Sequence, residues 1–259
     1  VTLIERVGRR PQPTAAGAEL MAHVGAIDTA VTTAVEAVGQ HTGTATGRIR
    51  LGTGATACIY LLPPVLKDLR RTYPRLEITV TTANTDDIVT AIMENRLDIG
   101  LVTLPVSGRS LEIIPTVKDE FLLVAPQGMK LPARITPGAL SDTPVLLFEP
   151  GANTRRIIDK WFAHKDIKPE PVMALGNVEA IKELVAAGLG CGIIPALALR
   201  REQKRHDIII RPLAPRLYRQ LAVVIRRDKR LTAGLKHLLH ILSILPDQDG
   251  RRANSVSRA

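Results

Sequence analysis

The sequence has few aromatic residues, only two cysteines and no long hydrophobic run. Phe, Trp and Tyr make up 3% of its 259 residues although 45% are hydrophobic, so the core must rest on Leu, Ile, Val and Ala. Such a core is typical of parallel α/β sheets covered on both faces. No apolar run approaches the roughly 20 residues that span a bilayer, and the N-terminus lacks a signal-peptide core. We therefore expect a cytoplasmic protein with no membrane partner.

Motifs for catalysis and metal binding are also missing from the sequence. It contains no Gly-rich phosphate loop, no nucleophile elbow and no carboxylate pair spaced for acid/base work. His237 and His240 lie one helical turn apart, but a solvated helix face explains them better than a metal site. Cys58 and Cys191, both expected to border a cleft, are better explained as free buried thiols than as a redox switch. We expect no catalytic residue, no metal and no cofactor.

Positive charge is abundant, with a formal net charge of +10. This charge suits a nucleic-acid partner or an anionic ligand, and it also fits a basic soluble surface. A run of basic residues between Arg200 and Arg230 is usually a solvated surface. The alternative is that these residues attract flanking DNA or an anionic effector.

Residues 177–195 are the most informative stretch and predict a helix, a tight reversal and a buried strand. Asn177 can cap the helix, and Gly188 stands where the helix must stop, because glycine tolerates the left-handed conformation. Gly190 and Gly192 would let the following strand pack closely against the helix.

The run Leu-Val-Ala-Ala-Gly-Leu-Gly-Cys-Gly-Ile-Ile-Pro within this stretch resembles the signature near the effector cleft of LysR-type transcriptional regulators. Residues 95–101, Asn-Arg-Leu-Asp-Ile-Gly-Leu, are similar to another strand of that family, with Asn95 where the family usually has glycine. The resemblance implies an α/β fold of two Rossmann-like lobes joined by two crossover strands, the type 2 periplasmic-binding-protein fold. A long linker helix and a remnant of a winged helix-turn-helix would precede it.

The segment from Leu3 to Gly17 resembles the end of the LysR-type DNA-binding domain, although its two prolines, Pro11 and Pro13, cannot donate to a hairpin ladder. The resemblance implies that residues 1–13 are a remnant of that domain and that the chain lacks the recognition helix. Its basic residues would then contact DNA phosphates, and a solvated basic end is the alternative. These residues are Arg6, Arg9 and Arg10.

A helix is predicted from Thr14 to roughly Val38, before a segment rich in Gly and Thr. Its apolar residues alternate spacings of four and three, as in a coiled-coil seam, and we expect a homodimer or homotetramer through this helix. A helix lying on its own domain is the alternative. The residues of this predicted dimer helix are Leu20, Val24, Ile27 and Val31.

The expected domain layout follows from this order. Residues 14–46 form the linker helix and hinge, residues 47–246 the effector-binding domain, and residues 247–259 a disordered tail. Lobe I takes about 47–121 and 223–246, and lobe II about 122–222. The hydrophobic pattern predicts separate strands at Leu111–Val117 and Glu120–Ala125, and again at Asp207–Arg211 and Leu217–Ile225.

The function implied by the resemblance is control of transcription through DNA and a small, anionic effector bound between the lobes. Hydroxyl and amide side chains at strand ends and helix starts, with one arginine, are the candidate effector-binding residues. They are Thr53, Thr56, Thr103, Asn153, Thr154, Arg155 and Asn177. A solute-binding protein of a transporter would share the fold but need an export signal, and an enzyme would need convergent catalytic residues.

Overall fold

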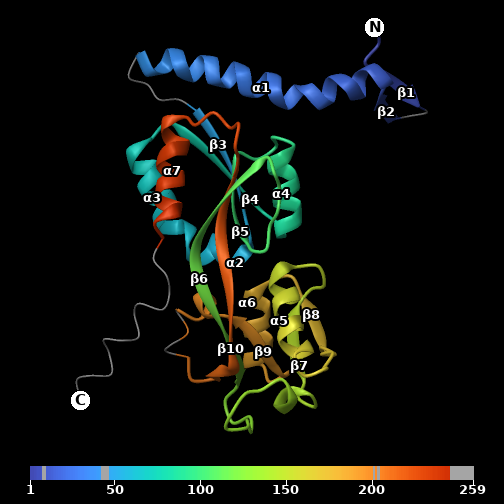
Figure 1. Ribbon diagram of the computed structural model, residues 1–259, viewed down its shortest axis with the longest axis vertical. Helices are drawn as coiled ribbons and strands as arrows, with labels where there is room; N and C mark the ends of the chain where they lie inside the picture. Colours follow the sequence, from blue (N-terminus) through green and yellow to red (C-terminus); the bar gives the residue numbers. More distant parts are fainter. Residues whose placement is uncertain (8–9, 42–46, 201, 203–204, 246–259) are drawn as a thin grey trace.

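The computed structural model describes residues 1–7, 10–41, 47–200, 202 and 205–245. A hairpin of β1 (Ile4–Val7) and β2 (Arg10–Pro13) leads into the long helix α1 (Ala15–His41). Helix α1 lies across one end of a two-lobed α/β body (Figure 1). The expected hinge at 42–46 and the expected tail at 247–259 lie outside the described residues.

Within the described residues, eight strands form one mixed sheet that passes through both lobes, in the order β4-β3-β5-β10-β6-β9-β7-β8. Strands β3, β4 and β5 are parallel in lobe I, and β7, β8 and β9 are parallel in lobe II. Strands β6 and β10 are antiparallel to each other and join the lobes (Figure 1). The strands are β3 (Gly47–Thr53), β4 (Leu76–Thr82), β5 (Ile99–Thr103), β6 (Leu111–Pro126), β7 (Val145–Phe148), β8 (Met173–Leu175), β9 (Cys191–Pro195) and β10 (Ile208–Arg226).

The two crossover strands correct the sequence prediction, which divided each of them in two. Both run unbroken from one lobe to the other, because the ladder between them absorbs irregularities at two register shifts. One shift lies between Pro212 and Leu217 and the other between Gln220 and Ala222. In β6 the polar residues Lys118 and Asp119 interrupt the hydrophobic pattern, and in β10 Pro212 and Pro215 interrupt it. The sequence prediction took each interruption for a strand end.

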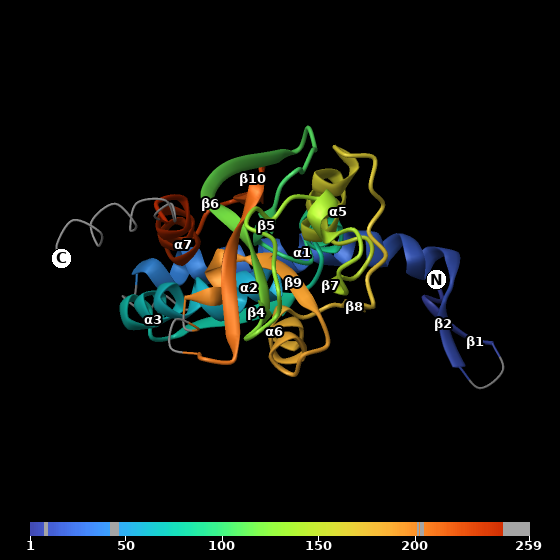
Figure 2. The ribbon, with the colours of Figure 1, turned by 90° about the horizontal axis from the view of Figure 1, so that it is seen from below.

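Four helices cover the two faces of the sheet in lobe I. Helices α2 (Ala55–Tyr60), α3 (Leu62–Thr72) and α7 (Ala233–Ser243) lie on one face and α4 (Thr85–Met93) on the other (Figures 1 and 2). Successive side chains of a strand point to opposite faces of the sheet, so Leu101 packs on the α3–α7 side and Val102 on the α4 side. Each face therefore has its own aliphatic core.

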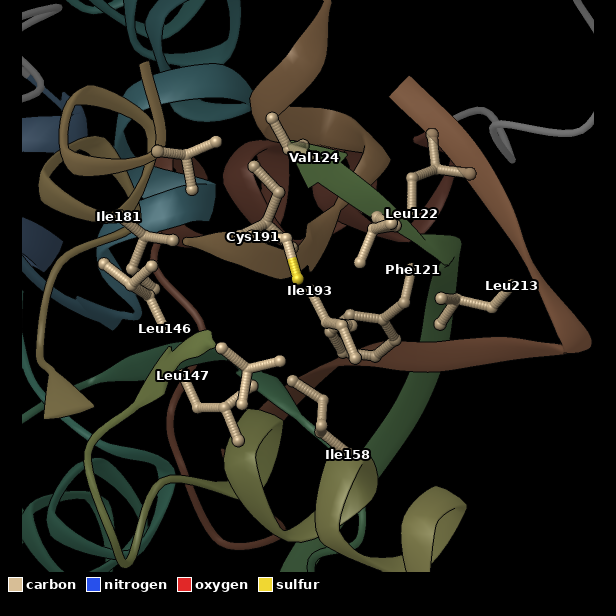
Figure 3. Close-up of a cluster of buried hydrophobic side chains, with 14 of the residues drawn as sticks. Phe121, Leu122, Val124, Leu146, Leu147, Ile158, Ile181, Cys191, Ile193 and Leu213 are labelled. Atoms are coloured by element: carbon tan, nitrogen blue, oxygen red, sulfur yellow. The ribbon is translucent and has the colours of Figure 1, made fainter. Parts of the chain in front are cut away.

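Lobe II has a single larger core between its strands, α5 (Asn153–Ala163) and α6 (Val178–Ala186). Figure 3 shows side chains of β6, β7, β9 and both helices meeting there, with the Cys191 sulfur among them. Cys191 is fully buried in this core, and neither cysteine lines the cavity between the lobes. The expectation that both border the cleft is therefore wrong, because Cys191 packs inside the core of lobe II.

The predicted helix, reversal and strand at 177–195 are confirmed as α6 and β9. Gly188 has a φ of 86°, and a Cβ on Gly192 would approach Ile181 of α6 to 2.7 Å. Gly190 serves a different neighbour from the one expected. A Cβ there would meet the carbonyl oxygen of Pro144 at 2.5 Å, so this glycine allows close approach to the start of β7 rather than to the helix.

The N-terminal hairpin forms despite its prolines. Pro11 pairs with Arg6 and Pro13 with Ile4 in the β1–β2 register. Prolines two residues apart face the same way, so both can turn their nitrogens away from the partner strand. Arg6 is exposed, Arg10 lies in β2, and Arg9 is outside the described residues.

Helix α1 contacts lobe I through one side and exposes another. The Asn95 side chain, on a residue with a φ of 58°, donates from Nδ2 to the Gly25 carbonyl oxygen at 3.0 Å. The apolar residues of the predicted seam point elsewhere, with exposed fractions from 41% to 58%. They are Leu20, Val24, Ile27 and Val31.

Candidate functional site

A cavity of about 320 Å³ lies between the two lobes, and we refer to it as the interlobe cavity. Lobe I contributes the ends of its parallel strands and the starts of α2 and α4, while lobe II contributes the starts of α5 and α6. Strand β10 closes it with Arg219 and Leu221. Carboxyl ends of strands and amino ends of helices therefore converge on one space, which is the usual position of a ligand site in α/β folds.

Several predicted effector-binding residues meet at the interlobe cavity, although they come from segments about a hundred residues apart in the sequence. They are Thr56, Thr103, Asn153 and Thr154. All of them are largely buried, so their polar groups face the cavity or other protein groups rather than bulk water.

The other predicted residues have structural partners and do not line the cavity. The Thr53 hydroxyl donates to the Leu101 carbonyl oxygen at 2.8 Å and ties β3 to β5. The Arg155 guanidinium donates from Nε to Asp159 at 2.7 Å, within α5. Asn177 caps α6 by accepting a backbone N–H bond at 2.8 Å.

Helix α5 opens onto the cavity with free backbone donors. Its N-cap residue, Ala152, offers no side-chain acceptor, and its first turn has no acidic residue. The first N–H groups and the helix dipole therefore present positive potential to the cavity beside Thr154. Asn153, in the same turn, bridges the lobes, because its Nδ2 donates to the Thr103 carbonyl oxygen at 2.7 Å.

Two carboxylates also line the cavity and limit its positive character. They are Asp87 of α4 and Glu149, which follows β7. Glu149 accepts a hydrogen bond from Asn84 Nδ2 at 3.4 Å, across the lobes. The cavity therefore carries both acidic and basic groups on its wall.

Sequence reasoning missed the buried pair of Arg219 and Asp119. These residues face each other across β10 and β6, and the Nε of Arg219 donates to Asp119 Oδ2 at 2.9 Å. Asp119 is fully buried and also accepts from the Leu197 backbone N–H at 3.1 Å. Burial raises the pKa of the Asp119 carboxyl, and the Arg219 guanidinium opposes that shift. Both strands carry other charged residues, such as Lys118 and Arg216, so the local sequence offered no signal for this pair.

A second polar group joins the lobes between α2 and α6. Lys182, 1% exposed, donates from Nζ to the Tyr60 hydroxyl at 2.7 Å and to Glu202 Oε1 at 2.6 Å. Glu179 Oε2 lies 2.8 Å from the same nitrogen. We call these residues the Lys182 network. Burial lowers the pKa of Lys182, but hydrogen bonds to its carboxylate and phenol partners outweigh burial and hold the pKa above its ordinary value.

The described ranges contain neither a metal-ion cluster nor a membrane-spanning helix. No cluster of His, Cys, Asp and Glu in them could hold a metal ion. None of the described helices is both long and apolar enough to cross a membrane. His237, one of the two histidines in α7, lies with its Nε2 3.0 Å from Asp68 Oδ2.

Comparison with known proteins places these features in a family. Residues 42–243 match the family model of the LysR substrate binding domain. The chain is 32% identical over 196 residues to the HTH-type transcriptional regulator YeiE of Escherichia coli K12, covering 74% of this chain and 67% of that protein. It is 30% identical over 260 residues to the HTH-type regulator CbbR of Xanthobacter flavus, covering 96% and 78%.

A solved structure with the same fold is the regulatory domain of Synechocystis PCC6803 CcmR in complex with 2-PG. Its TM-score is 0.69 at 24% identity, over 78% of this chain and 100% of that one. The chain therefore belongs to the LysR substrate binding domain family, the effector-binding part of LysR-type transcriptional regulators.

Proposed function

We propose that this chain controls transcription in response to a small anionic effector held in the interlobe cavity. The observation that supports it most is the uncapped start of α5, which opens onto the cavity with no acidic residue in its first turn. Hydroxyl groups of Thr56 from lobe I and Thr154 from lobe II line the cavity and suit an oxyanion acceptor. The CcmR regulatory domain, which has the same fold, was solved in complex with 2-PG.

The N-terminal hairpin is our candidate for DNA-backbone contact. It projects from the far end of α1, away from both lobes (Figure 1). Arg6, Arg9 and Arg10 would meet phosphate groups, which position a protein on the duplex without reading its sequence. Because an operator is reached in the cytoplasm, we expect the protein to act there.

Helix α1 is our candidate for self-association as a homodimer or homotetramer. Its exposed seam has coiled-coil spacing, and exposed aliphatic side chains at that spacing are stabilised when a second copy covers them. The seam residues are exposed, so the helix can contact its own domain through one side and bind a second copy through the other. They are Leu20, Val24, Ile27 and Val31.

The effector proposal is tested by a thermal-shift screen of small carboxylates and phosphates at matched ionic strength. A ligand that binds the folded state raises its stability with the logarithm of concentration over Kd. Thr56→Val should weaken the shift from a confirmed effector, because it removes a hydroxyl from the cavity wall. Thr90→Val, on the exposed side of α4, is the matched control and should leave it unchanged. An equal shift in both variants would place the site elsewhere.

A further inference from the structure

The side chain of Asn95, in the turn between α4 and β5, connects helix α1 to lobe I. Asn95 has a φ of 58°, a left-handed conformation that glycine adopts most easily and asparagine tolerates. Its Nδ2 donates to the Gly25 carbonyl oxygen at 3.0 Å, and its Oδ1 accepts from Lys229 Nζ at 2.9 Å. These partners fix the orientation of the amide, because a carbonyl only accepts and an ammonium only donates. One amide therefore bonds α1 at one end and lobe I at the other.

A group of buried charges holds this amide in place. Lys229 Nζ also donates to Asp98 Oδ1 at 2.6 Å, and these two side chains are only 8% and 9% exposed. Asp98 in turn accepts from the Arg50 backbone N–H at 2.7 Å and from the Arg50 guanidinium at 2.9 Å. Arg50 lies in β3, Asp98 directly precedes β5 and Lys229 follows β10, and these strands are neighbours in the sheet. The donor that reaches α1 is therefore anchored to the centre of lobe I.

The apolar contact between α1 and lobe I is loose. A groove of about 520 Å³ runs between them, and the helix side of this groove consists of small side chains that remain exposed. Met93, on the lobe I side, is 45% exposed. The small side chains are Ala22, Ala26, Ala30 and Ala34. Little apolar surface leaves water along this groove, so hydrophobic burial there contributes little to docking and the polar contact from Asn95 matters more.

The direction of α1 on lobe I determines where the N-terminal hairpin lies. The helix is 27 residues long, which is about 40 Å at the usual helical rise. The β1–β2 hairpin lies at its far end (Figure 1). A small change in the angle between α1 and lobe I therefore moves the hairpin over a large distance.

We propose that Asn95 is a docking residue that holds α1 on lobe I of its own chain, through a releasable contact that sets the position of the hairpin relative to the effector-binding domain. The contact uses the Gly25 side of the helix and leaves the exposed seam on its other side untouched. The helix can then change direction while the seam remains open to a second copy. This proposal does not depend on which effector binds in the interlobe cavity.

Two substitutions at Asn95 separate docking from the fold of the turn. Asn95→Gly removes the amide and keeps a residue suited to the left-handed backbone, so the turn should still form. Asn95→Asp keeps an acceptor for Lys229 but replaces the donor to Gly25 with a carboxylate oxygen, which repels the carbonyl oxygen. Asp166→Gly is the matched control, because Asp166 has a φ of 55° but is exposed after α5 in lobe II.

Double electron–electron resonance between two spin labels measures the direction of the helix. The labels are attached at Glu19→Cys on α1 and Lys236→Cys on α7, both exposed positions, in a Cys58→Ala background. Dilution with unlabelled protein restricts the signal to distances within one chain. We expect a narrow distance distribution for the parent and for Asp166→Gly. Both variants at Asn95 should give a broader distribution with a shifted mean, at unchanged helical content by circular dichroism.

Three results would overturn the proposal. The first is a distribution for Asn95→Gly that matches the parent, because docking would then not need the amide. The second is a shift in Asn95→Gly that is missing in Asn95→Asp, because the effect would then come from the bond with Lys229. The third is a broad distribution in the parent itself, which would show that α1 is not held on lobe I.

Discussion

Lys182 of α6 donates a hydrogen bond to the hydroxyl of Tyr60 on α2 at 2.7 Å, and this contact joins lobe II to lobe I. A second bridge lies between α4 and α5, where Arg156 Nη2 donates to Asp86 at 2.9 Å. The two bridges differ in burial. The first bridge contains Lys182, which is 1% exposed. The second bridge is largely exposed to solvent and contributes little to stability.

Removal of the Lys182 ammonium should destabilise the fold strongly. Lys182→Met leaves Glu202 and Glu179 without their shared cation, and breaking a buried pair from one side costs about 3–5 kcal/mol. Tyr60→Phe removes one hydrogen bond and should cost about 1–2 kcal/mol. Urea unfolding measures both. Tyr218→Phe, a half-buried tyrosine over Lys118, is the control, and equal free energies of unfolding for all variants would contradict the role of the network.

The Lys182 network should also make the protein sensitive to alkaline pH. The pKa of Lys182 is raised above 10.5 by its carboxylate and phenol partners, and burial raises the pKa of Tyr60 above 10.0. Both groups bind protons more tightly in the folded state, so their stabilisation is complete below the unfolded pKa values and declines as pH rises beyond them. Urea unfolding at about pH 9 and about pH 11 should show this loss. The variant with both Lys182→Met and Tyr60→Phe should lose less, and an identical loss would contradict the assignment.

Asp98 should determine how the stability of lobe I changes at acidic pH. Its carboxylate accepts from Arg50 at 2.9 Å and from Lys229 at 2.6 Å. Burial opposes ionisation, but these hydrogen bonds outweigh it and hold the pKa below 3.8. The stabilisation is therefore present above the ordinary pKa and is lost as pH falls below it.

Asp98→Asn tests this relationship. The variant removes the carboxylate that Arg50 and Lys229 share, so we expect about 3 kcal/mol of destabilisation at neutral pH and a smaller decline in stability on acidification. Asp142→Asn, in an exposed loop, is the control. Circular dichroism melts between about pH 3 and about pH 7 provide the measurement, since this window spans the ordinary carboxyl pKa. An unchanged acid profile in Asp98→Asn would argue against the ion pairs.

The two thiols should differ in reactivity. Cys191 is fully buried among aliphatic side chains, and burial raises its pKa to about 11 (Figure 3). The thiolate is the nucleophile, so Cys191 should react with a disulfide reagent only after unfolding. Cys58 is partly exposed and should react first. Cys58→Ala is the matched control, and rapid labelling of that variant in native buffer would contradict the buried position of Cys191.

Self-association should depend on the exposed seam of α1. Val24→Asp and Ile27→Asp place charge where a second copy would bury apolar surface, so both should shift the protein toward monomer in light scattering. Ala18→Asp adds the same charge on the same helix outside the seam and should leave the assembly unchanged. Monomeric parent protein at high concentration would contradict the prediction.

Local patterns predicted the local features of the fold. The Gly188 reversal and the Asn177 cap depend on neighbours within a few residues, and both were predicted. The Arg219 and Asp119 pair joins residues 100 positions apart. The residues that flank Arg219 in the sequence do not distinguish it from a solvated arginine, because its partner depends on which strands become adjacent in the fold.

The position of β10 has a consequence for synthesis on the ribosome. This strand lies between β5 and β6 in the sheet, yet it follows every other described strand in the chain. Until residues 208–226 emerge, β5 and β6 each expose an edge that has no partner, and the cores of both lobes lack one of their strands. Long-range pairing of this kind is slow, and unpaired edges invite misassembly. We therefore expect both lobes of the nascent chain to stay open until β10 has emerged.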